Sequence, residues 1–216
     1  MKNTEKSVSP DEQIIINQPK KPEGEYGKKK LEEMNSGRHV QLADWSFEHF
    51  PEIEPGYIAE LGCGGGRNAF ELLNRYPDAK LNAVDYSPLS VETAKKFNKE
   101  HIAAGRCEVL EGDVSHLSLE SGKYGLATAF ETIYFWPGLA DCFKEVARIL
   151  KPGGCFVIVN ESDGTDELGK AAEEKISGMK VYTPEEIIET LKAAGFSEAC
   201  FVHHPEYAWI TVVAKK

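Results

Sequence analysis

The sequence predicts an α/β protein in which a mostly parallel sheet carries helices on both faces. From residue 57 onward, strand-like and helix-like patterns alternate, as crossover connections between parallel strands require. The apolar run Ile58–Leu61 breaks into a glycine cluster and is followed by a helical pattern over 67–75. At 216 residues, the chain is long enough for one domain with a sizeable core.

The glycine cluster predicts a cradle for a nucleotide-like ligand. Residues 58–66 read Ile-Ala-Glu-Leu-Gly-Cys-Gly-Gly-Gly. Glycine lets the backbone approach a ligand closely, and the N-terminus of the following helix offers free N–H groups. The dinucleotide pattern G-x-G-x-x-G is not met, because Arg67 stands where its third glycine would fall. Glu60 would also repel a pyrophosphate, whereas it suits an ammonium group.

Further segments follow in the order that a nucleotide-binding sheet requires. Residues 81–85 read as a second strand, and its last residue, Asp85, lies about 20 residues past the glycines, where an acid accepts hydrogen bonds from both ribose hydroxyls. Residues 108–114 form a third strand-like segment, and 124–130 a fourth. The helix from Thr183 has Pro184 at its first position and precedes two final strands joined by a short turn, which predicts an antiparallel pair.

The acid before G-x-G-x-G resembles motif I of the class I S-adenosylmethionine (SAM) methyltransferases. Residues 86–97 resemble the second motif of that family and its following helix, and residues 108–114 resemble the third motif. Leu150-Lys-Pro-Gly-Gly154 is typical of the loop that leads into its fifth strand. The resemblance covers residues 56–216. It implies a Rossmann-like, seven-stranded, mostly parallel sheet with one antiparallel strand.

The resemblance implies SAM as the cofactor and assigns the residues that would contact it. These are Glu60, Gly62, Cys63, Gly64, Asp85, Tyr86, Asp113, Val114 and Phe130. The stretch Met34–Trp45 also resembles a segment that lies over the cofactor as a lid in small bacterial methyltransferases. Tyr26 and His39 are candidate cofactor contacts from this lid. The expected organisation is a loosely ordered N-terminal tail over 1–25, a helical lid over 26–55 and the SAM-binding domain over 56–216.

The acceptor site is expected directly after the fourth strand. Methyl transfer from a sulfonium is an in-line displacement with an activated donor, so the protein mainly positions the acceptor. Residues 131–137 read Glu-Thr-Ile-Tyr-Phe-Trp-Pro. Glu131 is the candidate base or amine partner, and Tyr134 a second candidate catalytic residue in the pocket wall. The Asn/Asp-Pro-Pro-Tyr/Phe tetrad and the Pro-Cys nucleophile of nucleobase methyltransferases are missing here.

Composition restricts the partners. The formal charge of −10, without a basic cluster interleaved with aromatic residues, disfavours nucleic acid as the substrate. The 5 cysteines form no C-x-x-C pair, so no metal site is expected. Their irregular spacing predicts free thiols in a reducing compartment, the cytoplasm. No apolar run is long enough to span a membrane. The expected partner is a small-molecule substrate, and the sequence leaves the oligomeric state open.

Three other classes remain open at this point. An aminopropyltransferase would share the fold, although its Gly-Gly-Gly-Asp-Gly-type loop is missing. A nicotinamide oxidoreductase would need the third glycine. A non-catalytic SAM-binding or partner-binding protein would keep the glycine motif and lose the acceptor site. A cavity near Glu131 would favour an enzyme, and a filled site would favour the binding protein.

Overall fold

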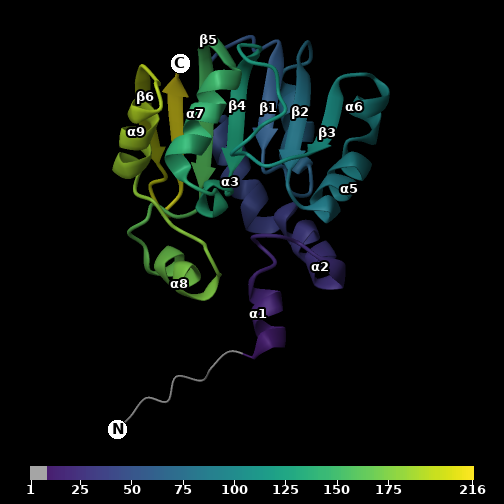
Figure 1. Cartoon of the computed structure of the whole chain (residues 1–216), viewed down its shortest axis with the longest axis vertical. Coiled ribbons are helices and arrows are strands. Elements are labelled where there is room, and N and C mark those ends of the chain that lie inside the picture. Colours follow the sequence, from purple (N-terminus) through teal and green to yellow (C-terminus); the bar gives the residue numbers. More distant parts are fainter. Residues whose placement is uncertain (1–8) are drawn as a thin grey trace.

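The computed structural model describes residues 9–216, which form a seven-stranded sheet with helices on both faces (Figure 1). The strands are β1 (Tyr57–Leu61), β2 (Lys80–Asp85), β3 (Cys107–Glu111), β4 (Tyr124–Phe130), β5 (Leu150–Asn160), β6 (Glu198–His203) and β7 (Ile210–Lys215). Their order is β3-β2-β1-β4-β5-β7-β6, and β7 runs antiparallel to both of its neighbours. The predicted Rossmann-like sheet with one antiparallel strand is confirmed.

The helices connect and flank these strands. They are α1 (Pro10–Ile16), α2 (Gly24–Met34), α3 (Gly37–Phe47), α4 (Arg67–Arg75), α5 (Pro88–Phe97), α6 (Lys99–Ala103), the short 3₁₀ helix η1 (Ile133–Phe135), α7 (Leu139–Ile149), α8 (Glu167–Lys175) and α9 (Pro184–Ala193). Figure 1 shows α1, α2 and α8 gathered beyond the carboxyl ends of the parallel strands. That edge is where open α/β sheets bind ligands.

The core consists of two apolar layers, one on each face of the sheet. Phe143 of α7 and Ile187 of α9 belong to one layer, and both are fully buried. Leu42 of α3 and Leu72 of α4 belong to the other. Every residue of β4 is buried, as expected for a central parallel strand covered on both faces. The two layers fix the carboxyl ends of the central strands, where the candidate site lies.

The N-terminal segment differs from the expected loose tail. Residues 10–16 form a helix whose N-terminus carries a capping box between Ser9 and Glu12. Gln13 donates a hydrogen bond to the Lys175 carbonyl over 3.1 Å, so this helix is also linked to the end of α8. Residues 1–8 of the predicted tail lie outside the described part of the chain.

In the dinucleotide pattern, the third glycine allows the helix to pack closely. Arg67 stands at that position in this chain, and the preceding residue, Gly66, allows the close packing instead. Its φ is +83°, and an added Cβ would lie 2.7 Å from the Cα of Ala94 in α5. Its carbonyl accepts a hydrogen bond from the Asn98 side chain over 2.8 Å. The start of α4 therefore sits against α5 at a separation that only glycine permits.

We expect Gly66→Ala to lower the free energy of unfolding by about 2–4 kcal/mol, since left-handed strain and overpacking add. Gly105→Ala is the matched control, because Gly105 also has a positive φ, +68°, but no atom within 4 Å of the added Cβ. The control should lose only about 1–2 kcal/mol. Urea denaturation measures both, and equal losses would contradict the packing role of Gly66.

Candidate active site

A cavity of about 490 Å³ lies at the carboxyl ends of the parallel strands. It runs from the glycine turn after β1, past the ends of β2 and β3, to the residues that follow β4 and β5. Segments from α2, α3 and α8 complete its wall. Twelve of the thirteen residues that the sequence predicts for the site line this cavity: Glu60, Gly62, Cys63, Gly64, Asp85, Tyr86, Asp113, Val114, Phe130, His39, Glu131 and Tyr134.

Tyr26 is the exception. Its side chain is 54 % exposed and lines a separate, shallower groove between α1, α2 and α8. Gly27 and Leu31 are the buried residues of α2, and the residue next to Gly27 on a helix points about 100° away from it. The geometry therefore does not support Tyr26 as a cofactor contact.

Asp85 joins the two turns that form the floor of the cavity. One carboxylate oxygen accepts a hydrogen bond from the Gly64 N–H, and the other accepts one from the Ser87 N–H, both over 2.9 Å. Burial raises the pKa of Asp85, while these backbone hydrogen bonds act in the opposite direction. Each oxygen has a second lone pair, so the carboxylate can still accept hydrogen bonds from a ligand's hydroxyl groups.

Glu60 is a buried acid without a partner for one of its oxygens. The residue is 1 % exposed, and its Oε2 has no hydrogen-bond partner among the described residues. Burial, with the nearby charge of Asp85, raises the pKa of Glu60 well above its usual value. An unpartnered buried carboxyl group is costly unless a ligand satisfies it. The orphaned oxygen therefore fits a ligand with a hydrogen-bond donor at this position.

The glycine turn is shaped by its contact with the segment after β4. Gly62 has a φ of +82°, and a Cβ there would lie 2.2 Å from the Thr132 hydroxyl oxygen. Thr132 in turn accepts a hydrogen bond from the Trp136 indole N–H over 3.2 Å. The two segments that would hold cofactor and acceptor are thus in direct contact.

Glu131 has an unusual backbone and a defined partner. Its φ of 56° makes it the sole non-glycine residue with a positive φ in the range 9–216. Such a conformation costs about 1–3 kcal/mol and persists only where the surroundings enforce it. Its N–H donates to the Val159 carbonyl over 2.7 Å, and its Oε2 lies 2.5 Å from Nδ1 of His39 in α3. The strained turn therefore directs this carboxylate toward α3.

A second acid, Glu161, lies in the same end of the cavity and follows β5. Burial and the charge of Glu131 raise its pKa, and the Arg38 guanidinium lies 3.4 Å from its carboxylate. Arg38 also lies over the rings of Tyr207 and Trp209, at 5.5 Å from each centroid. The hydrogen bond with Glu131 raises the pKa of His39. Two carboxylates thus face two basic side chains at this end.

Tyr134 supports the wall of the cavity rather than presenting a free hydroxyl. It is 4 % exposed, and its hydroxyl oxygen accepts a hydrogen bond from the Ser162 N–H over 3.1 Å. Burial raises its pKa well above the usual value, so the phenol stays protonated. The geometry favours Tyr134 as a link between η1 and the loop after β5.

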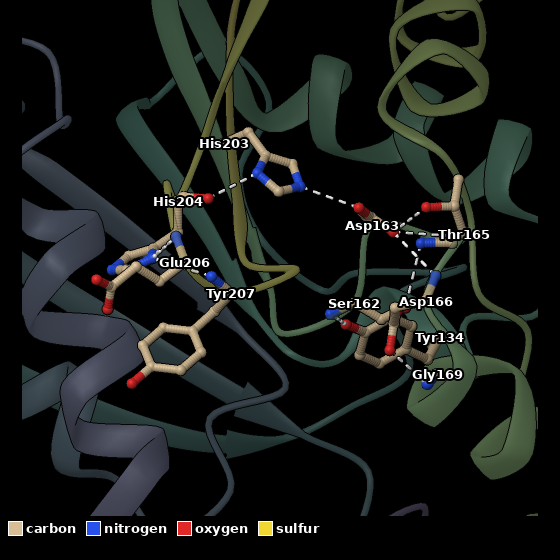
Figure 2. A network of polar contacts seen from close by, with 11 residues as sticks. Tyr134, Ser162, Asp163, Thr165, Asp166, Gly169, His203, His204, Glu206 and Tyr207 are labelled. Atoms are coloured by element: carbon tan, nitrogen blue, oxygen red, sulfur yellow. Dashed lines mark hydrogen bonds and ion pairs between the residues drawn. The ribbon is translucent and has the colours of Figure 1, made fainter.

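That loop is held by a polar network that reaches the β6–β7 hairpin (Figure 2). The Ser162 hydroxyl donates to the Asp166 carboxylate. The ring of His203 lies between the Asp163 carboxylate at 2.9 Å and the His204 carbonyl at 2.8 Å. Both partners are hydrogen-bond acceptors, and the hydrogen bond with Asp163 raises the pKa of His203. The network fixes the chain that leads into α8.

Helices α2 and α3 contact the glycine turn directly. The Asn35 side chain, between them, donates to the Gly65 carbonyl over 2.9 Å. Asp44 of α3 pairs with Arg67 at the start of α4, with 2.7 Å between oxygen and nitrogen. These contacts join the expected lid to the motif that it would cover.

Sequence reasoning missed Asn35, Thr132 and Glu161, all of which line the cavity. Glu161 follows β5 in the same way that Glu131 follows β4, so its position at a strand end is a signal that could have identified it. Asn35 has no comparable signal, because its role depends on how α2 and α3 pack.

Over residues 9–216, no group of three or more His, Cys, Asp or Glu side chains is arranged to hold a metal ion. In the same range, no helix has the length and apolar character needed to cross a membrane.

Comparisons with known proteins agree with this geometry. A family model described as "Methyltransferase domain" matches residues 58–154. A malonyl-[acyl-carrier protein] O-methyltransferase from Dechloromonas aromatica is 27 % identical over 170 residues, which cover 74 % of this chain and 61 % of that protein. A demethylmenaquinone methyltransferase from Lactococcus lactis is 33 % identical over 118 residues, covering 54 % and 46 %. The chain thus spans less than two thirds of the length of either relative.

Solved structures share the fold. One is a chain of the complex between the Haloferax volcanii methyltransferase activator Trm112 and a methyltransferase, with a TM-score of 0.75 and 19 % identity, covering 88 % of this chain and 94 % of that one. Another is a SAM-dependent methyltransferase from Thermotoga maritima, with a TM-score of 0.70 and 21 % identity, covering 88 % and 95 %. The methyltransferase-domain model thus matches the segment 58–154, and the solved structures share the fold of this chain, in agreement with the resemblance drawn from the sequence.

We expect Glu131→Gly to be more stable than Glu131→Ala by about 1 kcal/mol, because only glycine adopts the positive φ without strain. Both variants lose the carboxylate and its hydrogen bond with His39, so the difference isolates the backbone. Urea denaturation of the two proteins side by side gives the value. Equal stabilities would mean that the turn after β4 is not strained.

Proposed function

We propose that this protein is a SAM-dependent methyltransferase acting on a small-molecule acceptor. A single cavity supports this most directly, because it joins the glycine turn after β1 to the Glu131 end after β4. A donor and an acceptor held at these two ends would lie in one enclosed space, as in-line displacement requires. The relatives are named as a malonyl-[acyl-carrier protein] O-methyltransferase and a demethylmenaquinone methyltransferase, which agrees with the reaction class.

The cofactor end offers the groups that SAM needs. Bound SAM would supply an electrophilic methyl group on its sulfonium. Asp85 would accept hydrogen bonds from the ribose hydroxyls, and the unpartnered oxygen of Glu60 would accept one from the methionine ammonium group. Asp113 and Val114 would flank the adenine ring. The backbone of Gly62 and Gly64 would lie against the ligand, since neither residue carries a side chain of its own.

The acceptor end combines charged groups with an apolar wall. Phe135, Ile176 and Met179 line it beside the Glu131 and Glu161 carboxylates. This lining favours an acceptor with an apolar body and one polar group at the methylated atom.

All five cysteines are free thiols, which agrees with a reducing, cytoplasmic setting.

The alternatives are less well supported. For a nicotinamide oxidoreductase, the buried Glu60 carboxyl would face a pyrophosphate, and Arg67 replaces the third glycine. For an aminopropyltransferase, the chain lacks the Gly-Gly-Gly-Asp-Gly-type loop that is typical of that class. A non-catalytic binding protein would fill the space near Glu131, whereas the cavity extends to that residue.

We further propose that α2, which begins at Gly24, and α3 form the lid that the sequence assigns to residues 26–55. The preceding chain also crosses the cofactor end, because the Ser87 hydroxyl donates to the Pro22 carbonyl over 2.9 Å. On the far side, the Lys20 ammonium donates to the Ser177 carbonyl over 3.0 Å. The N-terminal segment thus contacts both sides of the cavity, and its movement away from them would open a path for ligands.

SAM or S-adenosylhomocysteine should bind, and NAD should not. Asp85→Ala should weaken SAM binding tenfold or more, since each lost hydrogen bond to a charged acceptor is worth about 1 kcal/mol or more. Asp78→Ala, which removes an exposed acid, is the control and should bind as the wild type does. Titration calorimetry gives the affinities. Binding of NAD without SAM would reject the proposed function.

Hydrogen exchange over residues 26–45 should slow when S-adenosylhomocysteine binds, because lid closure protects backbone amides. Helix α9 packs away from the cavity and serves as the internal reference, with no change expected. Mass spectrometry of peptic fragments resolves the two segments. The same protection in α2 and α3 with and without ligand would show that they are a fixed part of the domain.

A further inference from the structure

The pairing of His39 with Glu131 determines which nitrogen of the imidazole keeps a free lone pair. A carboxylate only accepts hydrogen bonds, so the proton in the 2.5 Å contact lies on Nδ1. In the neutral ring, Nε2 then carries the lone pair. No residue in the range 9–216 forms a hydrogen bond with Nε2, and the His39 side chain lines the cavity. This is the arrangement of a base oriented by an acid.

We propose that His39 is the general base of this enzyme and that Glu131 is the residue that positions it. The inference rests on the proposed methyl transfer, and it exchanges the roles expected from the sequence, where Glu131 was the candidate base and His39 a cofactor contact. Glu131 is fixed by its strained turn. Its carboxylate already accepts a hydrogen bond from the Nδ1–H of His39, so it is engaged with the imidazole rather than with the acceptor. His39 offers the basic atom that remains available.

The acceptor X–H uses an electron pair on X to form a bond to the methyl carbon of SAM. The carbon–sulfur bond breaks, and its electron pair goes to the sulfur of S-adenosylhomocysteine. The proton of X–H moves to Nε2 of His39, and the Glu131 carboxylate stabilises the resulting imidazolium. The acceptor therefore has a proton to lose, as a hydroxyl, an enol, a thiol or a primary amine has, whereas a tertiary amine or a thioether has none.

The surroundings of His39 set the pH dependence. Lys30 and Glu33 face it from α2, Arg38 neighbours it on α3, and Glu131 and Glu161 face it from the ends of β4 and β5. The hydrogen bond with Glu131 is the largest influence and raises the pKa of His39. The base must be neutral, so transfer should increase as the pH rises through this raised pKa, which lies above the ordinary value of 6.5.

Three variants test the assignment. His39→Gln keeps an amide donor for Glu131 but has no basic nitrogen. Glu131→Gln keeps the shape of the side chain and removes its charge. His116→Gln is the control, because His116 is exposed and does not line the cavity. SAM affinity is measured by calorimetry. Transfer is measured as label moving from methyl-labelled SAM into a small-molecule extract of the source cells, over a range of pH.

The expected result is a loss of transfer of about a hundredfold or more in His39→Gln, with SAM affinity within about threefold of the wild type. Glu131→Gln should shift the acidic limb of the pH profile to lower pH, because the group that raises the pKa of His39 is gone. His116→Gln should behave as the wild type. Full transfer in His39→Gln, or a loss explained by weaker SAM binding alone, would overturn the assignment.

Nitrogen NMR of the histidine side chains provides a readout that needs no acceptor. In the complex with S-adenosylhomocysteine, neutral His39 should carry its proton on Nδ1, and Glu131→Gln should lower its pKa. A proton on Nε2 would overturn the inference, even if no compound in the extract were methylated. Failure of the wild type to bind SAM would instead reject the proposed function, so the two failures are distinguishable.

Discussion

The hydrogen bonds of the Asp85 carboxylate are the constraint on which the candidate site depends. A single side chain ties the glycine turn after β1 to the turn that begins α5. The two turns belong to neighbouring parallel strands, so their separation is set by the sheet, and the carboxylate fixes their orientation. Without it, the Gly64 and Ser87 N–H groups would lack a partner at the floor of the cavity. The cradle is therefore built around a negative charge before any ligand is present.

The acids of the cavity illustrate how burial separates groups of the same chemistry. Glu60 is buried with an unpartnered oxygen and a raised pKa, whereas Asp85 is stabilised by two backbone donors. Glu131 is half-enclosed and committed to His39. The same functional group thus keeps an unpartnered oxygen in Glu60, holds two turns together in Asp85 and forms a hydrogen bond with an imidazole in Glu131. Its environment decides which, because desolvation and hydrogen bonding act on the charged form in opposite directions.

Much of the fold followed from local sequence signals. The glycine cluster, the acid at the end of β2 and the proline at the start of α9 each act within a few residues, so their structures could be predicted directly. Helix α1 was missed although Ser9 and Glu12 spell a capping box, because the polar composition of the tail suggested loose order. Most of the predicted site residues line one cavity because motif order fixes which strand end each one occupies.

The part of the site that the sequence did not predict, the pairing of His39 with Glu131, depends on a contact between segments far apart in the chain. His39 and Glu131 are separated by 92 residues, so no spacing rule could pair them. Their meeting requires α3 to pack over the ends of β4 and β5, which Leu42 and Ala43 achieve by burying their side chains in the core. The same packing that stabilises the helix therefore brings the imidazole to the carboxylate. Stability and candidate chemistry share one cause here, because the burial of Leu42 and Ala43 also holds His39 beside Glu131.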